Sequence, residues 1–486
     1  MTQPTRPVSE IVMMDATSLS RAIHSREVSC DEVMSAYLDH IDALNPQVNA
    51  IVALQPRGEL LAQARERDAQ LRRGQSMGPL HGFPHAPKDL QAVKGIRMTS
   101  GSPILKDYVP GADSPMVERL RAAGVIFIGK TNTPEFGLGS HTYNPVYGAT
   151  RNAYVPTVSA GGSSGGAAVA LALHMLPVAD GSDYGGSLRN PAGWNGVYGL
   201  RTSIGRVPTD ARDGWLPSMG VNGPMARNVT DLALLLSVQA GFDPRLPLSL
   251  DGDGAAFQSG LEKSFEGTRI AWGGDFKDHA PCEPGVTAVC RKAARTLESL
   301  GCSVEDALPE FDFEALWQAT IRLRGWQQGS ALLAYYRDPA QRALLKPEAV
   351  FEIETGLRQS AYEITAASVL RMQWTQTLRR FFERYDFLIL PTAQVFPFEV
   401  NQHWPQEIAG RKMRTYHEWM KGALFISMSG CPALAAPAGF SDQGLPIGIQ
   451  IIAPNRQELS CLQLAHAYES VFDAVNCRLP ALLNRA

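Results

Sequence analysis

The sequence predicts an α/β protein, a single large domain in which α-helices cover both sides of a mixed central β-sheet. Three observations predict this class. Short apolar segments typical of buried strands alternate with helical segments from about residue 80 onward. The 486 residues are 44% hydrophobic and 19% charged, which is enough apolar sequence for a large core. The sequence contains no repeat or long linker that would divide the chain into separate domains.

The N-terminal part, about residues 1–75, is expected to form a helical layer. Ser29 and Glu32 make a capping-box pattern, and apolar residues then recur at helical spacing. A second helical run covers residues 59–73. These two runs predict at least two packed helices ahead of the sheet.

The middle of the chain, about residues 80–210, has the alternation of helices and buried strands that is expected of the core. A helix is predicted over 114–124 and a buried strand over 124–130. The apolar segment AAVALALHMLPVA (167–179) predicts a buried helix followed by a strand. Clusters of glycine and serine flank this segment on both sides. Because the segment between them is apolar and is expected to be buried, the glycines are expected to occupy specific places in the fold and not to form a flexible linker.

The C-terminal part, about residues 211–486, continues the α/β pattern and is expected to complete the substrate pocket. The predicted strands cover residues 268–274, 302–307, 386–393, 432–440 and 446–454. The predicted helices cover residues 284–301, most of 310–384, and 458–472. One mixed sheet accounts for all of these strands.

The bulk properties exclude several classes of function. The net charge is −3 with both signs mixed along the chain, so a nucleic-acid partner is not expected. No signal peptide or apolar run long enough to span a membrane is present, which predicts a cytoplasmic enzyme. The cysteines lack ligand spacing, so neither a zinc site nor a disulfide framework is predicted, and most should be core thiols. They are Cys30, Cys282, Cys290, Cys302, Cys431, Cys461 and Cys477.

The second cluster, GSDYGGS (181–187), could carry a nucleophile. Ser187 follows two glycines, so a substrate carbonyl can approach it closely, and the backbone N–H groups of such a turn can converge on an oxyanion. Alternatively, the turn simply ends a strand and Ser187 caps the next helix. A serine nucleophile also needs a base.

Two kinds of base are available. The pattern GxSxG fits Ser164, and Asp386 and His417 could complete a Ser-His-Asp triad. Lys88 lies in a proline-rich apolar segment, where burial could supply the roughly three-unit fall in pKa that a lysine needs to be half neutral near pH 7. Residue types alone leave both alternatives open.

Three motifs together resemble the amidase signature family of Ser-cisSer-Lys amide hydrolases. They are KDL (88–90), GGSSGG (161–166) and GSDYGGSLRNPA (181–192). Further similarity covers GKTNTPEFGLG (129–139), GVYGLRTSIGRVP (196–208) and GLPIGIQIIAP (444–454). The resemblance therefore runs through most of the chain, and it implies the mixed α/β sheet between helical layers that this family shares.

The resemblance also implies roles for individual residues. Ser187 would be the acylated nucleophile, Ser163 the bridging serine after a cis peptide at Gly162, and Lys88 the base. The implied oxyanion donors are the backbone N–H groups of Tyr184, Gly185, Gly186 and Ser187. The implied supporting residues are Ser164, Asp183 and Arg189. The expected substrate contacts are Gly137, Leu138 and Tyr184, with no cofactor and no metal.

Four residues depart from the commoner family pattern. Tyr184 stands where many members carry a small residue, and Asn190 follows Arg189 where branches differ. Pro87 directly precedes Lys88, and His85 lies close by in a segment that is more often apolar. These departures leave the substrate open.

The predicted function is hydrolysis of a small-molecule carboxylic amide by water, with an aryl amide or anilide as the expected substrate. Trp317, Trp326 and Trp419 lie in regions that could line the pocket. Two alternatives are a glutamine-hydrolysing subunit of a tRNA-dependent amidotransferase and a catalytically inactive binding protein. The sequence leaves acyl and amine specificity, stereoselectivity, ester or carbamate side activity and oligomeric state open, with a homodimer among the assemblies it allows.

Overall fold

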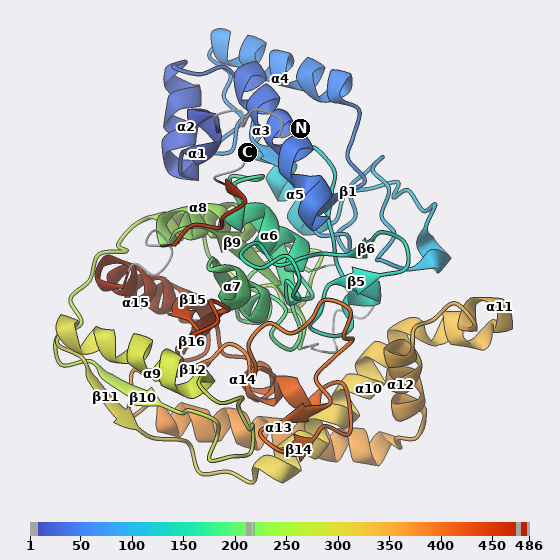
Figure 1. The fold of residues 1–486 in the computed structure, drawn as a ribbon, viewed down its shortest axis with the longest axis vertical. Helices are drawn as coiled ribbons and strands as arrows, with labels where there is room; N and C mark the ends of the chain where they lie inside the picture. The colour runs from blue at the N-terminus through green and yellow to red at the C-terminus, as the bar shows by residue number, and fades with distance from the viewer. Residues whose placement is uncertain (1–7, 210–215, 217–218, 473–477, 484–486) are drawn as a thin grey trace.

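A large mixed sheet forms the centre of the molecule (Figure 1). The computed structural model describes residues 8–209, 216, 219–472 and 478–483, and within these ranges the central sheet has eight strands. Across the sheet they are β11 (Ser303–Asp306), β10 (Arg269–Trp272), β12 (Phe387–Pro391), β16 (Pro446–Ile452), β15 (Ala433–Phe440), β8 (Tyr198–Arg201), β9 (Val221–Ala226) and β7 (Ala179–Asp183). Strand β10 runs parallel to β11 and β12, and all other neighbours are antiparallel.

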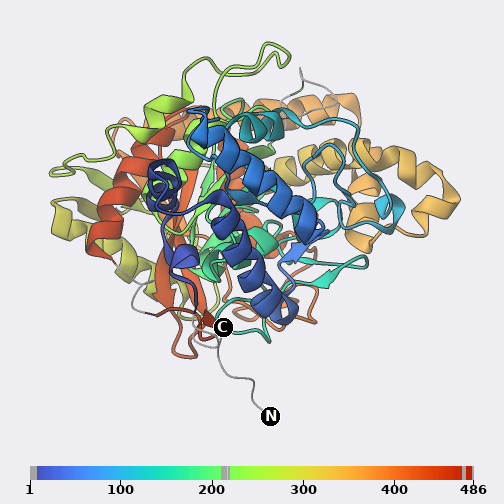
Figure 2. The same ribbon diagram turned by 90° about the horizontal axis from the view of Figure 1, so that it is seen from above.

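Helices surround this sheet. In chain order they are α1 (Glu10–Met13), α2 (Ala16–Ser25), α3 (Cys30–Val48), α4 (Arg57–Arg72), α5 (Pro115–Ala122), α6 (Gly165–Ala172), α7 (Arg189–Asn195), α8 (Val229–Gln239), α9 (Val286–Arg295), α10 (Phe313–Arg337), α11 (Pro339–Arg342), α12 (Pro347–Leu357), α13 (Ala361–Phe381), α14 (Lys421–Ser429) and α15 (Glu458–Val471). In the view from above, the yellow-orange helices α10–α12 lie at one side of the molecule and α9 and α15 at the other (Figure 2). The predicted fold class, a single α/β domain with a mixed sheet, is confirmed.

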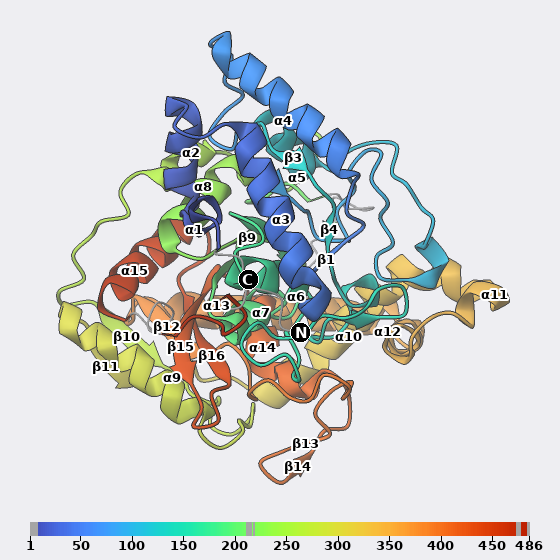
Figure 3. The same cartoon turned by 45° about the horizontal axis from the view of Figure 1, so that its top comes forward.

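The N-terminal helices form the layer that the sequence predicts. Ser29 Oγ accepts a hydrogen bond from the backbone N–H of Glu32 (3.1 Å), and the Glu32 carboxylate accepts one from the backbone N–H of Ser29 (2.8 Å). This capping box begins α3, which packs against α4. Figure 3 shows α3 crossing in front of the core.

The strand predicted over residues 124–130 is interrupted. The segment is buried, but it forms two short strands, β3 (Ile126–Phe127) and β4 (Lys130–Thr131), in two separate pairs outside the central sheet. These pairs are β2 (Pro84–His85) with β3, and β1 (Ile51–Val52) with β4. The other two-stranded pairs are β5 (Tyr143–Asn144) with β6 (Gly148–Ala149), and β13 (Glu407–Ile408) with β14 (Arg411–Lys412), which projects from the body in Figure 3.

The helix predicted between the two glycine-serine clusters is confirmed, whereas the strand begins only at Ala179 and lies mostly within the second cluster. Every residue of α6 is buried, and β7 follows it at the edge of the central sheet. His174, just after α6, is a satisfied core residue because its Nδ1 lies 3.1 Å from the carbonyl oxygen of Val12. The helix and strand together bring residues 163–164 beside residues 182–187.

The remaining sequence predictions concern cysteines and membrane segments. Five of the six described cysteines are buried and all six are free thiols, whereas Cys477 lies outside the described residues. In the ranges that the structure describes, each helix is too short or too polar to span a membrane.

The close backbone packing at α6 predicts that a side chain larger than hydrogen at Gly166 would destabilise the fold. A Cβ at Gly166 would lie 2.3 Å from the backbone nitrogen of Asn132 and 2.6 Å from the carbonyl oxygen of Ala50. We expect Gly166→Ala to lower the free energy of unfolding by about 1–3 kcal/mol or more, because neither backbone atom can move away freely. Gly58→Ala is the control, since a Cβ there meets no atom within 4 Å and alanine favours the helix. Urea denaturation measures both variants, and equal stability of the two would contradict the prediction.

Candidate active site

A cavity of about 670 Å³ lies beside the glycine-serine clusters. The residues of these clusters that line it include Ser163, Ser182 and Ser187. The other walls come from residues near 90 and 137, from residues between 204 and 222, from residues between 246 and 249, and from helix α10. Ser163 is 2% exposed and Ser187 7% exposed, so both hydroxyls are accessible mainly from within the cavity.

Lys88 is fully buried behind Ser163 and is not itself part of the cavity lining. Its Nζ is 2.7 Å from Ser163 Oγ, 2.9 Å from Ser164 Oγ and 3.0 Å from Ser182 Oγ. A neutral lysine amine has two N–H donors and one lone pair. Three hydroxyl oxygens therefore match it well, because two can accept from the amine while the third donates to its lone pair.

Burial sets the protonation state of this amine. Loss of water lowers the pKa of Lys88 to about 7, although the nearby carboxylates of Asp180 and Asp183 favour the charged form. A substantial fraction of Lys88 is therefore uncharged near neutral pH. A buried neutral amine in contact with a hydroxyl can act as a general base.

Ser187 follows β7 and does not cap the next helix. The N-cap of α7 is Leu188, which makes no side-chain capping bond. The carbonyl oxygen of Ser187 accepts a hydrogen bond from the backbone N–H of Ser164 (3.1 Å), which ties the two clusters together. The peptide bond between Gly162 and Ser163 is cis. Within the described residues no hydrogen bond joins the Ser163 and Ser187 hydroxyls directly, and such catalytic contacts often tighten only when substrate binds.

The turn before Ser187 offers backbone donors. The N–H groups of Gly185 and Ser187 have no acceptor in the part of the chain that the structure describes. Gly186 differs from the sequence expectation, because its N–H donates to Asp183 Oδ1 (2.9 Å) and so is already engaged. Gly186 adopts φ +103°, and a Cβ there would lie 2.8 Å from the Cβ of Ala423, so both the turn and the packing against α14 favour glycine.

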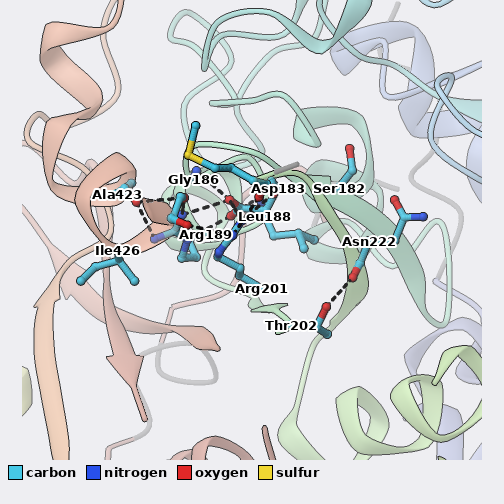
Figure 4. Close-up of polar contacts among 12 residues, drawn as sticks. Ser182, Asp183, Gly186, Leu188, Arg189, Arg201, Thr202, Asn222, Ala423 and Ile426 are labelled. Atoms are coloured by element: carbon cyan, nitrogen blue, oxygen red, sulfur yellow. Dashed lines mark hydrogen bonds and ion pairs between the residues drawn. The ribbon is translucent and has the colours of Figure 1, made fainter. Parts of the chain in front are cut away.

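A buried ion-pair network holds this turn in place (Figure 4). Arg189 Nε donates to Asp183 Oδ2 and its Nη2 to Oδ1, both at 3.0 Å, and Arg201 Nη1 donates to Oδ1 at 3.1 Å. The backbone N–H of Leu188 also donates to Asp183 Oδ2 (3.1 Å). Burial alone would raise the pKa of Asp183, but the two guanidinium groups hold it well below the ordinary value.

Three of the side chains in these networks were not identified from the sequence. Ser182 contacts the lysine amine, Arg201 shares the Asp183 carboxylate, and Gln450 accepts from Arg189 Nη1 (2.7 Å). Ser182 lies inside the second cluster, and this position was the only signal for it. Gln450 is an isolated polar residue within the strand predicted over 446–454, a pattern that can indicate a buried polar network. Arg201 lies in the 196–208 motif, which the sequence did not assign to a strand.

The Ser-His-Asp alternative is not assembled. Ser164 Oγ lies with Lys88 and Ser182, whereas the Nε2 of His417 lies 2.8 Å from Glu352. Asp386 accepts from the backbone N–H of Arg269 (2.8 Å) near the start of β12. The three residues of the alternative triad thus have other partners, and the GxSxG match around Ser164 reflects a close-packed turn.

The predicted substrate contacts, Gly137, Leu138 and Tyr184, all line the cavity. Of the three tryptophans, only Trp326 does so. The expectation was wrong for Trp317, whose ring packs near Lys421, and for Trp419, which stacks on Trp194 with ring centroids 5.9 Å apart.

Tyr184 is fixed against helix α10. Its hydroxyl donates to Gln327 Oε1 (2.6 Å), and the Arg324 guanidinium lies over its ring at 4.7 Å from the centroid. Arg324 in turn donates from Nε to Glu352 (2.6 Å). The residue before the Gly-Gly-Ser turn is therefore a rigid aromatic wall of the cavity. The described His, Cys, Asp and Glu side chains form no group of three that could hold a metal ion.

Comparison with known proteins gives consistent results. A family model described as Amidase matches residues 32–462. An acylamidase of Rhodococcus erythropolis is 34% identical over 463 residues, which cover 94% of this chain and 95% of the relative. A glutamyl-tRNA(Gln) amidotransferase subunit of Moorella thermoacetica is 34% identical over 482 residues, covering 95% of this chain and 97% of the relative. The crystal structure of a bacterial aryl acylamidase of the amidase signature family superposes with a TM-score of 0.91 at 28% identity, covering 98% of this chain and all of that one.

The Asp183 network makes a second stability prediction. Asp183→Asn leaves two buried guanidinium groups without their counter-charge, so we expect a loss of about 3–5 kcal/mol in unfolding free energy. Glu383→Gln removes one partner of an exposed pair with Arg379, whose side chains are 60% and 59% exposed, and should change stability little. Chemical denaturation of both variants checks this. Similar small losses for the two would show that the buried network contributes no more than a surface pair.

Proposed function

The chain belongs to the amidase signature family of amide hydrolases, and we propose that it hydrolyses aryl amides through an acyl-enzyme on Ser187. In this proposal Lys88 is the general base and Ser163 carries the proton between Lys88 and Ser187. The observation that carries the proposal is the contact of 2.7 Å between the buried Lys88 Nζ and Ser163 Oγ, at the wall of the cavity that Ser187 also lines.

The first step adds Ser187 to the amide and forms a tetrahedral intermediate. Lys88 Nζ accepts the proton of the Ser163 hydroxyl while Ser163 Oγ accepts the proton of Ser187. Ser187 Oγ bonds to the amide carbonyl carbon, and the electron pair of the C=O bond moves to the oxygen. The N–H groups of Gly185 and Ser187 stabilise this oxyanion, and a donor of this kind is typically worth about 10²–10³ in rate.

Collapse of this intermediate forms the acyl-enzyme. The oxyanion re-forms the C=O bond and the C–N bond breaks as the proton on Lys88 passes through Ser163 to the leaving amine, so the amine departs neutral. Water then attacks the carbonyl carbon of the Ser187 ester and gives one proton through Ser163 to Lys88. The bond between the carbonyl carbon and Ser187 Oγ breaks as that proton returns through Ser163 to Ser187 Oγ, which releases the carboxylic acid and restores the enzyme. The network of Asp183 and Arg189 takes no proton and holds the turn that carries the nucleophile.

The shape and polarity of the cavity support an aryl substrate. Its walls include Leu90, Phe136, Val207 and Trp326, with Tyr184 directly before the Gly-Gly-Ser turn. Apolar and aromatic walls favour flat apolar groups over small polar amides. The aryl acylamidase structure supports the same substrate class, and the acylamidase relative supports amide hydrolysis.

The tRNA-dependent amidotransferase relatives support a second candidate, a glutamine-hydrolysing component of such an enzyme. The two proposals differ in their partners. Release of ammonia from glutamine that begins only when partner proteins are added would favour the second candidate, whereas turnover of anilides by the chain alone favours the first.

Covalent labelling tests the proposed nucleophile and base. We expect a fluorophosphonate to label Ser187, and the rate should rise with pH through about 7, because the uncharged fraction of Lys88 increases as the pH passes its lowered pKa. Lys88→Met should slow labelling by about 10²–10⁴. Lys94→Met, which removes an exposed lysine, is the matched control and should label like the wild type. Peptide mapping reads the site, and label on Ser164 would refute the assignment.

A substrate panel tests the aryl preference. Anilides should show higher kcat/KM than aliphatic amides with the same acyl group, and Trp326→Ala should lower kcat/KM for anilides by about tenfold because the ring loses an aromatic contact. Trp317→Phe is the control, since Trp317 lies outside the cavity lining. Faster turnover of aliphatic amides throughout the panel would refute the aryl preference and leave amide hydrolysis intact.

A further inference from the structure

A buried histidine-aspartate pair lies beside Lys88 and takes no part in the proton route described above. His85 in β2 and Asp180 in β7 are both fully buried. His85 Nε2 lies 2.9 Å from Asp180 Oδ1, so with an ionised carboxylate this ring nitrogen carries the donated proton. The other carboxylate oxygen, Oδ2, accepts the backbone N–H of Lys88 at 3.3 Å. The carboxylate thus joins the histidine ring to the backbone of the proposed base.

The same strand also contacts the other end of the lysine. Asp180 and Ser182 are two residues apart in β7, so their side chains lie on the same face, about 7 Å apart along the strand. The backbone N–H of Lys88 is bonded to Asp180, and its Nζ is bonded to Ser182 Oγ (3.0 Å). The lysine side chain therefore runs along β7, anchored at both ends.

The Asp180 charge differs from the neighbouring Asp183 charge in how it is balanced. Asp183 is paired with two guanidinium groups, whereas the described ion-pair partner of Asp180 is His85 alone. Asp180 is also the main carboxylate that opposes the effect of burial on Lys88. The charged and titratable groups around the pair are Lys88, Asp89, Lys130 and Asp183 with Arg189 and Arg201.

We propose that Asp180, oriented by His85, is a positioning residue that aligns Lys88 along β7 and whose charge sets the pH range in which Lys88 can accept a proton. The inference rests on the proposed function of Lys88. A negative charge close to the amine stabilises the ammonium form, so Asp180 moves the onset of activity toward higher pH. The hydrogen bond that His85 donates to the Asp180 carboxylate partly offsets its negative charge, and this limits how strongly Asp180 stabilises the ammonium form of Lys88.

Burying this histidine-aspartate pair in the core also costs free energy, because the carboxylate loses its hydration. Two apolar side chains of similar volume would need no desolvation of a carboxylate and are often as stable. His85 Nδ1 has no hydrogen-bond partner among the described residues, so the pair is not fully satisfied. A purely structural role is therefore a poor explanation for a charged pair at this place.

The experiment measures fluorophosphonate labelling of Ser187 as a function of pH, which requires no knowledge of the substrate. Asp180→Asn keeps an acceptor for the Lys88 N–H and removes the charge, so the midpoint should fall by about one pH unit while the limiting rate at high pH changes little. The double variant His85→Val with Asp180→Leu removes charge and acceptor together. It should show the same lowered midpoint, and its limiting rate should fall about tenfold because Lys88 loses its anchor.

The controls separate this inference from the proposed function. Asp231→Asn alters another buried carboxylate, which accepts the backbone N–H groups of Ala16 (2.7 Å) and Thr17 (2.9 Å), and should leave the midpoint unchanged. An unchanged midpoint in either Asp180 variant that folds overturns the role of the charge, and an unchanged limiting rate in the double variant overturns the alignment. Absence of labelling at Ser187 in the wild type would instead refute the proposed function.

Discussion

The central constraint in this structure is that a lysine amine must be buried and uncharged yet keep all of its hydrogen bonds. Lys88 meets it because three hydroxyl oxygens surround Nζ within 3.0 Å. Hydroxyl groups can donate or accept, so they suit both protonation states of the amine. Carboxylates in these positions would hold the amine charged, and apolar groups would leave its N–H donors unpaired. The serine-rich composition of both clusters follows from this requirement.

The edge of the central sheet is what makes such a site available. Strand β7 ends the order of strands, so one row of its backbone groups has no neighbouring strand in the described part of the chain. Ser164 fills this place, because its Oγ accepts the backbone N–H of Ser182 (3.3 Å) and donates to the Ser182 carbonyl oxygen (3.4 Å). Lys88 Nζ also lies 3.4 Å from that carbonyl. At Ser182, an edge that would otherwise be exposed to pairing is thus covered by Ser164 and by Lys88, the proposed base.

The sequence predicted the fold class and most strands of the sheet, because buried strands and amphipathic helices leave a clear apolar pattern. Most lysines are surface residues, so the apolar segment around Lys88 made it only one of two candidate bases, and the family resemblance favoured it over the other. Ser182 and Arg201 could not be assigned, because their roles depend on which backbone edge is open and on which strands become neighbours. Trp317 and Trp419 were misplaced for a related reason: the region of the chain in which a tryptophan lies does not show which cavity or core its ring faces.

Alternation along β7 divides the electrostatics of the site into two parts. Asp180 and Ser182 share one face with Lys88, whereas Asp183 points to the other face, where Arg189 and Arg201 neutralise it. A carboxylate is well suited to bind the N–H groups of the nucleophile turn, but its unbalanced charge would keep the neighbouring lysine protonated. Placing it on the opposite face and pairing it with guanidinium groups preserves its hydrogen bonds and weakens its field at the amine. The arginines thus serve the base as much as the turn, although neither of them touches Lys88 among the described contacts.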